Sequence, residues 1–148
     1  MYLGRQRGML RLVKTRPIAI GIFETTPAVR LIGGRQRSSG RVVFPLPTDD
    51  QRFERVELPH RGNLWSYTMQ RVAPKSPPYK GGEGFEPFAV GYVELPGACI
   101  VESRLTQVRF EELRVGMPME LTTLLLHTEA DGTAVVIYAF QPAPTAQL

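Results

Sequence analysis

The sequence contains only one cysteine, Cys99, among its 148 residues. A single thiol cannot close an intramolecular disulfide, and it cannot build a zinc site from paired cysteines. We therefore expect the protein to work in a reducing compartment. Cys99 lies in the apolar run of residues 98–101, where an unpaired cysteine is expected to pack as a small hydrophobic side chain rather than to act as a nucleophile.

Long hydrophobic runs are also missing near the N-terminus. The apolar run there, residues 18–23, is too short for the core of a signal peptide or for a membrane span. Together with the lone cysteine, this predicts a cytoplasmic protein that makes no contact with a membrane.

Catalytic signatures are absent as well. The sequence has no metalloprotease motif, nucleophile elbow, P-loop or dinucleotide fingerprint. His60 and His127 belong to no catalytic pattern, and the glycine-rich residues 81–84 lack the Lys-Ser/Thr that a P-loop requires. The adjacent Glu111 and Glu112 point in different directions on a helical turn. The sequence therefore predicts no catalytic residue and not an enzyme in its own right.

Positive charge is concentrated at the start of the chain. Residues 1–41 hold nine Lys and Arg against Glu24 alone, which gives 9 − 1 = +8, whereas the remainder holds nine basic and thirteen acidic residues, 9 − 13 = −4. A basic segment of this kind can meet phosphates, nucleic acid or an acidic protein surface, or can simply form a solvated arm.

What the sequence does have is the alternation of apolar and polar residues that is typical of β-strands. Its thirteen prolines and fourteen glycines disfavour long helices. Beyond residue 54, apolar and polar residues alternate in strand-length runs, with one helical turn at residues 110–113. The first run, residues 55–58 continuing at 63–72, reads as one long strand with a bulge or turn at residues 59–62. Turn residues at Pro96 and Gly97, and again at Asp131 and Gly132, predict two hairpins.

This pattern predicts a mainly β protein with an OB-type Greek-key β-barrel, although a sandwich of the same strands fits it too. We divide the chain into four regions: a basic N-terminal arm at 1–30, a small loop-rich region at 31–54, the barrel at 55–140 and a tail at 141–148. The proline- and glycine-rich residues 73–87 form a long loop, which is a candidate for ligand or partner contact or else a solvated connector.

Four motifs occur in a particular order along residues 31–140: LIGGRQRSSGRVVFP at 31–45, LWSYTM at 64–69, FEPFAVGYVEL at 85–95 and LRVGMPMEL at 113–121. In this order they resemble the acyl-CoA-associated OB-fold family with an N-terminal rubredoxin-like zinc ribbon, named domain of unknown function thirty-five (DUF35). The resemblance implies a non-catalytic accessory subunit that assembles with a thiolase-like catalytic subunit and helps to form its acyl-CoA site. Acyl-CoA is then the substrate of the complex, and this chain itself binds no cofactor.

The sequence departs from that family at the metal site. The family's ribbon carries two Cys-x-x-Cys knuckles, and here the first aligns with Gln36 and Ser39 while the second falls near Asp49 to Arg52. Amide, hydroxyl and guanidinium groups are poor zinc ligands. The resemblance therefore implies a degenerate zinc-ribbon-like region at residues 31–54 that binds no metal.

Candidate contact residues follow from charge and aromaticity. Basic and aromatic side chains near the degenerate knuckle and the long loop can hold an acidic partner surface or the phosphates of CoA: these are Arg35, Arg37, Arg41, Arg71, Lys75, Tyr79 and Lys80. Trp65, Phe85 and Phe88 are candidates to line an acyl passage, and strand alternation places Trp65 and Tyr67 on one face. Barrel core is the alternative role for these aromatic residues.

Two other functions fit parts of the pattern. Single-stranded nucleic-acid binding suits an OB-type barrel with a basic arm and interleaved aromatics. The net charge of −4 beyond residue 41 argues against a basic groove on the barrel, so a nucleic-acid partner is disfavoured. A stand-alone thioesterase or hydratase ranks last, because no acid/base motif is visible.

Overall fold

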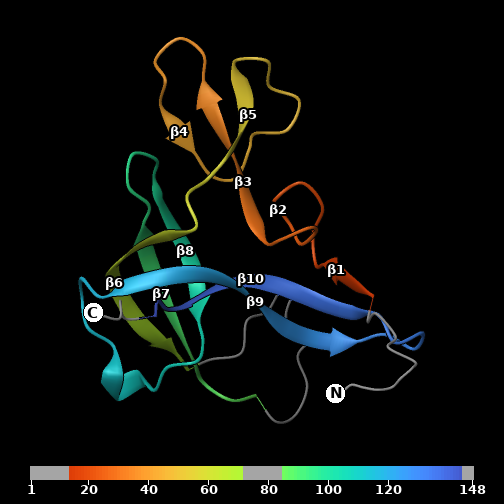
Figure 1. The fold of residues 1–148 in the computed structure, drawn as a ribbon, viewed down its shortest axis with the longest axis vertical. Helices are drawn as coiled ribbons and strands as arrows, with labels where there is room; N and C mark the ends of the chain where they lie inside the picture. Colours follow the sequence, from red (N-terminus) through yellow and green to blue (C-terminus); the bar gives the residue numbers. More distant parts are fainter. Residues whose placement is uncertain (1–13, 72–84, 145–148) are drawn as a thin grey trace.

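Two β-sheets stand one above the other along the long axis of the molecule (Figure 1). The structure, a computed structural model, describes residues 14–71 and 85–144. Within these ranges the regular elements are strands, with a single turn of 3-10 helix, η1 (Phe110–Glu112). The prediction of a mainly β protein is confirmed.

The lower sheet closes into a barrel of five strands. These are β6 (Arg61–Gln70), β7 (Phe88–Glu94), β8 (Ile100–Leu105), β9 (Pro118–Thr128) and β10 (Ala134–Pro142). They pair in the order β10-β8-β7-β6-β9, and β9 pairs again with β10. The β10–β8 pairing is parallel and the other pairings are antiparallel. This is the strand order of an OB barrel, so the barrel prediction is confirmed and the sandwich alternative is wrong.

Both predicted hairpins are present. Leu95 N–H donates to the Cys99 carbonyl at 2.9 Å, and Gly97 takes a φ of +70° in the turn between β7 and β8. Between β9 and β10, Gly132 has a φ of +91°. Glycine accepts this left-handed backbone without a steric cost, which is why the two turns could be located from the sequence.

The upper sheet is built around β3 (Arg30–Gln36). It pairs with β2 (Phe23–Glu24), β4 (Val42–Val43) and β5 (Phe53–Glu57), each in antiparallel fashion. The expectation that residues 55–58 begin the first barrel strand is wrong, because β5 pairs with β3 from Phe53 to Glu57. The alternation of apolar residues is the same for either pairing, and it cannot reveal which strand lies alongside.

One hydrophobic core runs through both sheets. Phe23 and Leu31 from the upper sheet belong to the same buried cluster as Leu64, Val93 and Phe140 from the barrel. Tyr138 on β10 lies at the junction. Its ring packs edge-on against Phe23 and Phe44, both with centroids 5.6 Å away, and its hydroxyl donates to the Glu102 carbonyl at 3.0 Å. The two sheets are therefore packed as a single body.

A short strand links the beginning of the described chain to its end. β1 (Thr15–Pro17) pairs in parallel with β10, with Thr15 opposite Ala134 and Pro17 opposite Val136. This pairing lengthens the sheet beyond the end of β8, so that β1, β10 and β9 form a three-stranded arm (Figure 1). In the described residues, no helix has the length and apolar character to cross a membrane.

Gly62 provides a test of the closed barrel. A Cβ at this position would lie 2.2 Å from the Glu94 carbonyl oxygen and 3.0 Å from Leu95 Cδ2. We expect Gly62→Ala to lower the free energy of unfolding by about 2–3 kcal/mol, because the backbone of β7 cannot move away cheaply. The control Gly97→Ala meets no atom within 4 Å, and its cost of about 1 kcal/mol comes from the positive φ alone. Urea denaturation measures both; equal costs would contradict the close strand contact.

Tyr138 provides a test of the junction between the sheets. Burial, with a smaller contribution from the Glu102 carboxylate, raises the pKa of Tyr138 from 10 to about 12. A raised pKa in the folded state means that the stabilisation is complete below pH 10 and is lost as the pH rises through about 12. We expect stability to fall across this window, and Tyr138→Phe to remove that part of the fall. Denaturant midpoints measured at successive pH values check this; an identical alkaline loss in Tyr138→Phe would contradict it.

Candidate functional site

The predicted knuckle at the tip of the upper sheet is a hydrogen-bonded turn. The Ser39 hydroxyl donates to Gln36 Oε1 at 2.5 Å, and the N–H of Arg41 donates to Ser39 Oγ at 3.2 Å. Gly40 N–H closes the turn on the Gln36 carbonyl at 2.7 Å. The two residues that the resemblance aligns with zinc ligands therefore bond to each other across the turn.

The second turn is fastened to the first by Arg37. Its backbone N–H donates to the Arg52 carbonyl at 2.8 Å, and its Nε donates to the Gln51 carbonyl at 3.1 Å. Within the second turn, Arg52 Nη2 lies 2.7 Å from Asp50 Oδ2. This hydrogen bond from the Arg52 side chain, helped by the Arg52 backbone N–H, lowers the pKa of Asp50 to about 2. We call these contacts of Gln36, Arg37, Ser39, Asp50 and Arg52 the polar clasp.

No metal site is visible in the described ranges, where no three His, Cys, Asp or Glu side chains gather closely enough to hold an ion. The donor set of the polar clasp also fits zinc poorly, since it contains no thiolate or imidazole. Whether the upper sheet is a zinc ribbon that has lost its metal stays a prediction.

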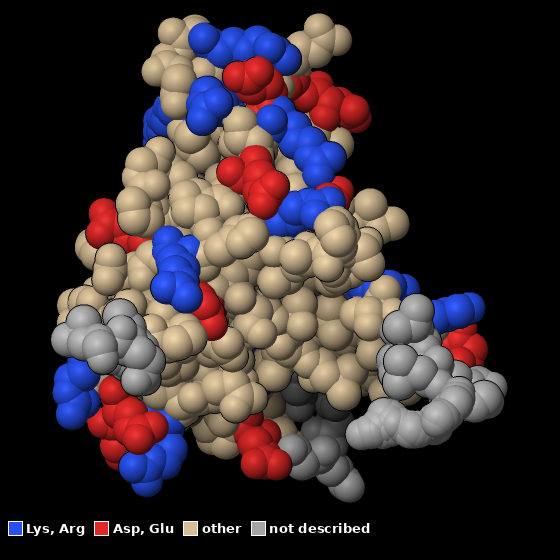
Figure 2. All heavy atoms as spheres, viewed as in Figure 1, with Lys and Arg blue, Asp and Glu red and all other residues tan. Residues whose placement is uncertain are grey.

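The structure brings the predicted arginines Arg35, Arg37 and Arg41 together at the tip of the upper sheet. Glu54 partly neutralises the charge of the first two, since its carboxylate lies 4.0 Å from Arg35 and 3.8 Å from Arg37. Arg41 is exposed and forms no ion pair with any described residue. Figure 2 shows Lys/Arg and Asp/Glu atoms interleaved over this end of the molecule, not separated into a basic patch. Exposed pairs of this kind stabilise the fold little and remain free to exchange partners.

The predicted loop residues Lys75, Tyr79 and Lys80 lie outside the described residues. Arg71, directly after β6, is exposed. The structure therefore places Arg71 at one end of the barrel, away from the arginine cluster at the tip of the upper sheet.

The aromatic candidates lie on the outer face of the barrel in two places. Trp65 packs edge-on against Tyr92 with ring centroids 6.5 Å apart, while Phe85 packs against Phe88 at 5.9 Å near the start of β7. The prediction that Trp65 and Tyr67 share a face is wrong. A bulge between Leu64 and Ser66 shifts the alternation of β6. As a result Tyr67 turns toward the core, where its ring meets Phe110, and Trp65 turns outward.

Arg104 was not among the predicted site residues, yet its surroundings are unusual. The guanidinium lies 3.7 Å from the centroid of the Phe88 ring, and the buried Nε has no hydrogen-bond partner. Burial lowers the pKa of Arg104. The register of the predicted hairpin could have indicated this position, because it places Arg104 opposite Val90 on the outer face of β7 and β8.

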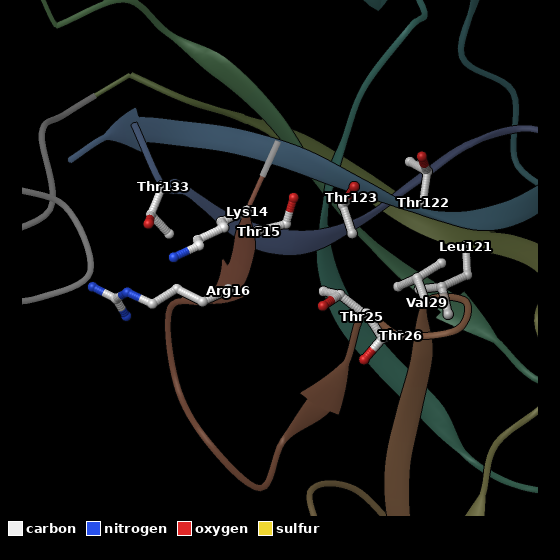
Figure 3. A pocket seen from close by; sticks show the side chains of 10 residues that line it. All are labelled: Lys14, Thr15, Arg16, Thr25, Thr26, Val29, Leu121, Thr122, Thr123 and Thr133. Atoms are coloured by element: carbon white, nitrogen blue, oxygen red, sulfur yellow. The ribbon is translucent and has the colours of Figure 1, made fainter. Parts of the chain in front are cut away.

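A pocket of about 740 Å³ lies between the three-stranded arm and the turn that joins β2 to β3 (Figure 3). It was not predicted. Most of the residues that line it are threonines, which offer both a hydroxyl and a methyl group: Thr15, Thr25, Thr26, Thr122, Thr123 and Thr133. Its two cations, Lys14 and Arg16, both come from the end near β1, and Glu129 holds the Arg16 guanidinium at 2.6 Å. Thr133 in its wall bonds to the Asp131 carboxylate through its backbone N–H, at 2.9 Å, and through its side chain, and these contacts stabilise the turn between β9 and β10.

His60 and Cys99, two side chains of types common in catalysis, lie in surroundings typical of structural residues. His60 Nε2 lies 3.0 Å from Glu57 Oε2 in an exposed pair, away from any described nucleophile. Burial raises the pKa of the Cys99 thiol, which therefore stays protonated, and Cys99 packs against the core as predicted.

Comparison with known proteins decides the family. Residues 55–124 match the family model described as ChsH2, C-terminal OB-fold domain. A DUF35 domain-containing scaffold protein of Pyrococcus furiosus is 30% identical over 119 residues, which cover 76% of this chain and 83% of that protein. The chain belongs to the DUF35 family. The resemblance seen in the motifs is thus confirmed.

Two further DUF35 matches agree with this assignment. A DUF35 domain-containing scaffold protein of Methanocaldococcus jannaschii is 26% identical, with 76% of this chain and 81% of that protein covered. A chain of the solved Ltp2-ChsH2(DUF35) aldolase superposes with a TM-score of 0.53 at 23% identity, covering 76% of this chain and 84% of that one. The latter match supports the fold.

The polar clasp leads to a prediction about metal. Because its contacts are hydrogen bonds and ion pairs, we expect a chelator to leave the melting temperature of the purified DUF35 chain unchanged. Elemental analysis should find zinc far below one ion per chain. As a control for the clasp, Ser39→Ala should lower the melting temperature slightly, by removing the bond to Gln36. Stoichiometric zinc, or melting at a lower temperature after chelation, would contradict this picture of the tip.

Proposed function

We propose that this DUF35 chain is a non-catalytic accessory subunit, which binds a thiolase-like catalytic subunit and helps to form its acyl-CoA site. One observation carries the proposal: two relatives, each covered over more than four-fifths of its length, are both named scaffold proteins. A scaffold works through the surfaces that it presents, and it needs no reactive group of its own.

The structure suits such a role in two respects. The His60–Glu57 pair is exposed to solvent and burial raises the pKa of the Cys99 thiol, whereas an acyl-transfer nucleophile needs a lowered pKa. The two sheets share one core, and this makes a single body whose two ends can hold other chains in a fixed relation. The lone, protonated Cys99 also suits work in the reducing cytoplasm.

The identity of the partner rests on resemblance. The ordered motifs at 31–45, 64–69, 85–95 and 113–121 are those of subunits that accompany thiolase-like enzymes acting on acyl-CoA. The solved relative is named as an aldolase that joins Ltp2 to a DUF35 protein. The exposed arginines Arg35, Arg37, Arg41 and Arg71 are the proposed contacts for an acidic partner surface or for the phosphates of CoA.

Co-expression with a thiolase-like subunit from the same organism tests the proposal. We expect the two chains to elute together in size-exclusion chromatography. We also expect the turnover of acyl-CoA by the catalytic subunit to fall at least about tenfold when this chain is withheld, because part of the substrate site is then missing. The isolated chain should turn over no acyl-CoA thioester.

Two results would reject the proposal. One is a chain that stays monomeric beside every thiolase-like subunit of its organism and leaves their activities unchanged. The other is thioester turnover by the chain alone, which would reveal a catalytic site of its own.

A further inference from the structure

The outer face of the barrel carries a group of apolar and aromatic side chains that no other described element covers. We call it the β7–β8 patch. Its members come from β7, from β8 and from the bulge of β6; they are Trp65, Phe88, Val90, Tyr92, Ile100 and Arg104.

Strand pairing makes these side chains neighbours. Thr68 of β6 lies opposite Val90, which lies opposite Arg104 of β8, and Tyr92 lies one pleat further along β7. Side chains two residues apart on a strand point to the same face, so Phe88, Val90 and Tyr92 form a row along β7. The alternate residues of β7, Ala89, Gly91 and Val93, face inward and are buried.

Three large side chains of the patch are exposed to solvent. The exposed fractions of Trp65, Tyr92 and Ile100 are 56%, 43% and 42%. Trp65 and Tyr92 already hold each other in an edge-on contact, so little side-chain freedom remains to be lost when another surface covers them. Rigid exposed aromatic pairs are typical of the residues that contribute most to protein–protein binding.

Arg104 sets the chemistry of whatever covers the patch. Its guanidinium is stacked on Phe88 and half-buried, and no described carboxylate pairs with it. Its Nε is already buried without an acceptor. A purely apolar surface would bury the remaining donors as well, at a large cost in free energy. A surface that brings a carboxylate gains a charge-assisted bond instead.

The other charges on this face argue against nucleic acid. Glu94 and Glu102 lie opposite Ile100 and Tyr92 in the same outer row. A single partner carboxylate can pair directly with Arg104, but a run of phosphates would also place unpaired negative charge beside these two carboxylates. OB barrels often bind oligonucleotides on this face, but they do so with a basic groove around the aromatics. A protein surface is therefore the better occupant.

We propose that the β7–β8 patch is the docking surface for the catalytic subunit, and that this subunit meets it with an apolar surface that carries a carboxylate opposite Arg104. The proposal rests on the proposed function and adds to it the place of contact and the chemistry of the partner. It also assigns Trp65 and Phe88 to protein contact in place of an acyl passage.

Single substitutions, measured with the purified thiolase-like subunit of the same organism, test the patch. We expect Trp65→Ala and Tyr92→Ala each to raise the Kd about thirtyfold, because both truncate central aromatic contacts. Arg104→Gln should raise it at least about tenfold by removing the charge that meets the carboxylate. Isothermal titration calorimetry gives the Kd values, and thermal melts confirm that each variant is folded.

Leu125 supplies the matched control. It is as exposed as Trp65, with an exposed fraction of 57%, but it lies on the β9 arm outside the patch. Leu125→Ala should change the Kd less than about twofold. A second comparison uses Arg35→Glu with Arg41→Glu, which reverses the charge of two proposed contacts at the tip of the upper sheet, leaves the patch intact and measures the share of binding that the tip contributes.

The outcomes separate the two proposals. If the wild-type chain binds the catalytic subunit and the patch variants bind equally well, while the tip variants bind weakly, the patch is not the docking surface and the proposed function stands. If the wild-type chain binds no thiolase-like subunit at all, both proposals fail. Tight, salt-sensitive binding of a labelled single-stranded oligonucleotide that is lost in Trp65→Ala would assign the patch to nucleic acid and overturn the inference.

Discussion

The contact of Tyr138 with Phe23 and Phe44 is the interaction on which the arrangement of the molecule depends. It is the place where the last strand of the barrel meets two separate segments of the upper sheet. Without it, the barrel would still close through β9 and β10, but the upper sheet would be held only by the rest of the shared core, to which it contributes Leu31. If the barrel and the upper sheet both contact a partner, this junction is what keeps the two contact surfaces in a fixed relation.

The features that local chemistry determines could be predicted from the sequence. The hairpins at Gly97 and Gly132 follow from backbone conformations that only glycine adopts easily, and the barrel follows from the alternation around them. Features that depend on a distant strand could not be predicted. β5 has the same apolar alternation in either sheet, and the bulge at Trp65 is visible only once β7 is in place. Arg104 is a different case: it meets Phe88 across the predicted hairpin, and only the register of that hairpin, not its turn residues, indicates the contact.

The tip of the upper sheet shows how a turn pair can be joined without a metal. Arg37 bonds the second turn through two backbone carbonyls, those of Gln51 and Arg52, and Ser39 bonds Gln36 within the first. These bonds contribute far less than a structural zinc ion, so the tip relies on the flanking pairing of β4 and β5 with β3. Its arginines, shared between Glu54 and solvent, remain available to other groups.

The many pairings of β10 determine the order in which the protein can fold during synthesis. It pairs with β1, β8 and β9, and it carries Tyr138, so the arm, the closed barrel and the junction of the sheets all form only after β10 has been synthesised. Until then β8 and β9 each keep one open edge, which another chain could pair with. Closure of the barrel is therefore a late step of folding, whereas β6, β7 and β8 can pair with one another before β10 exists.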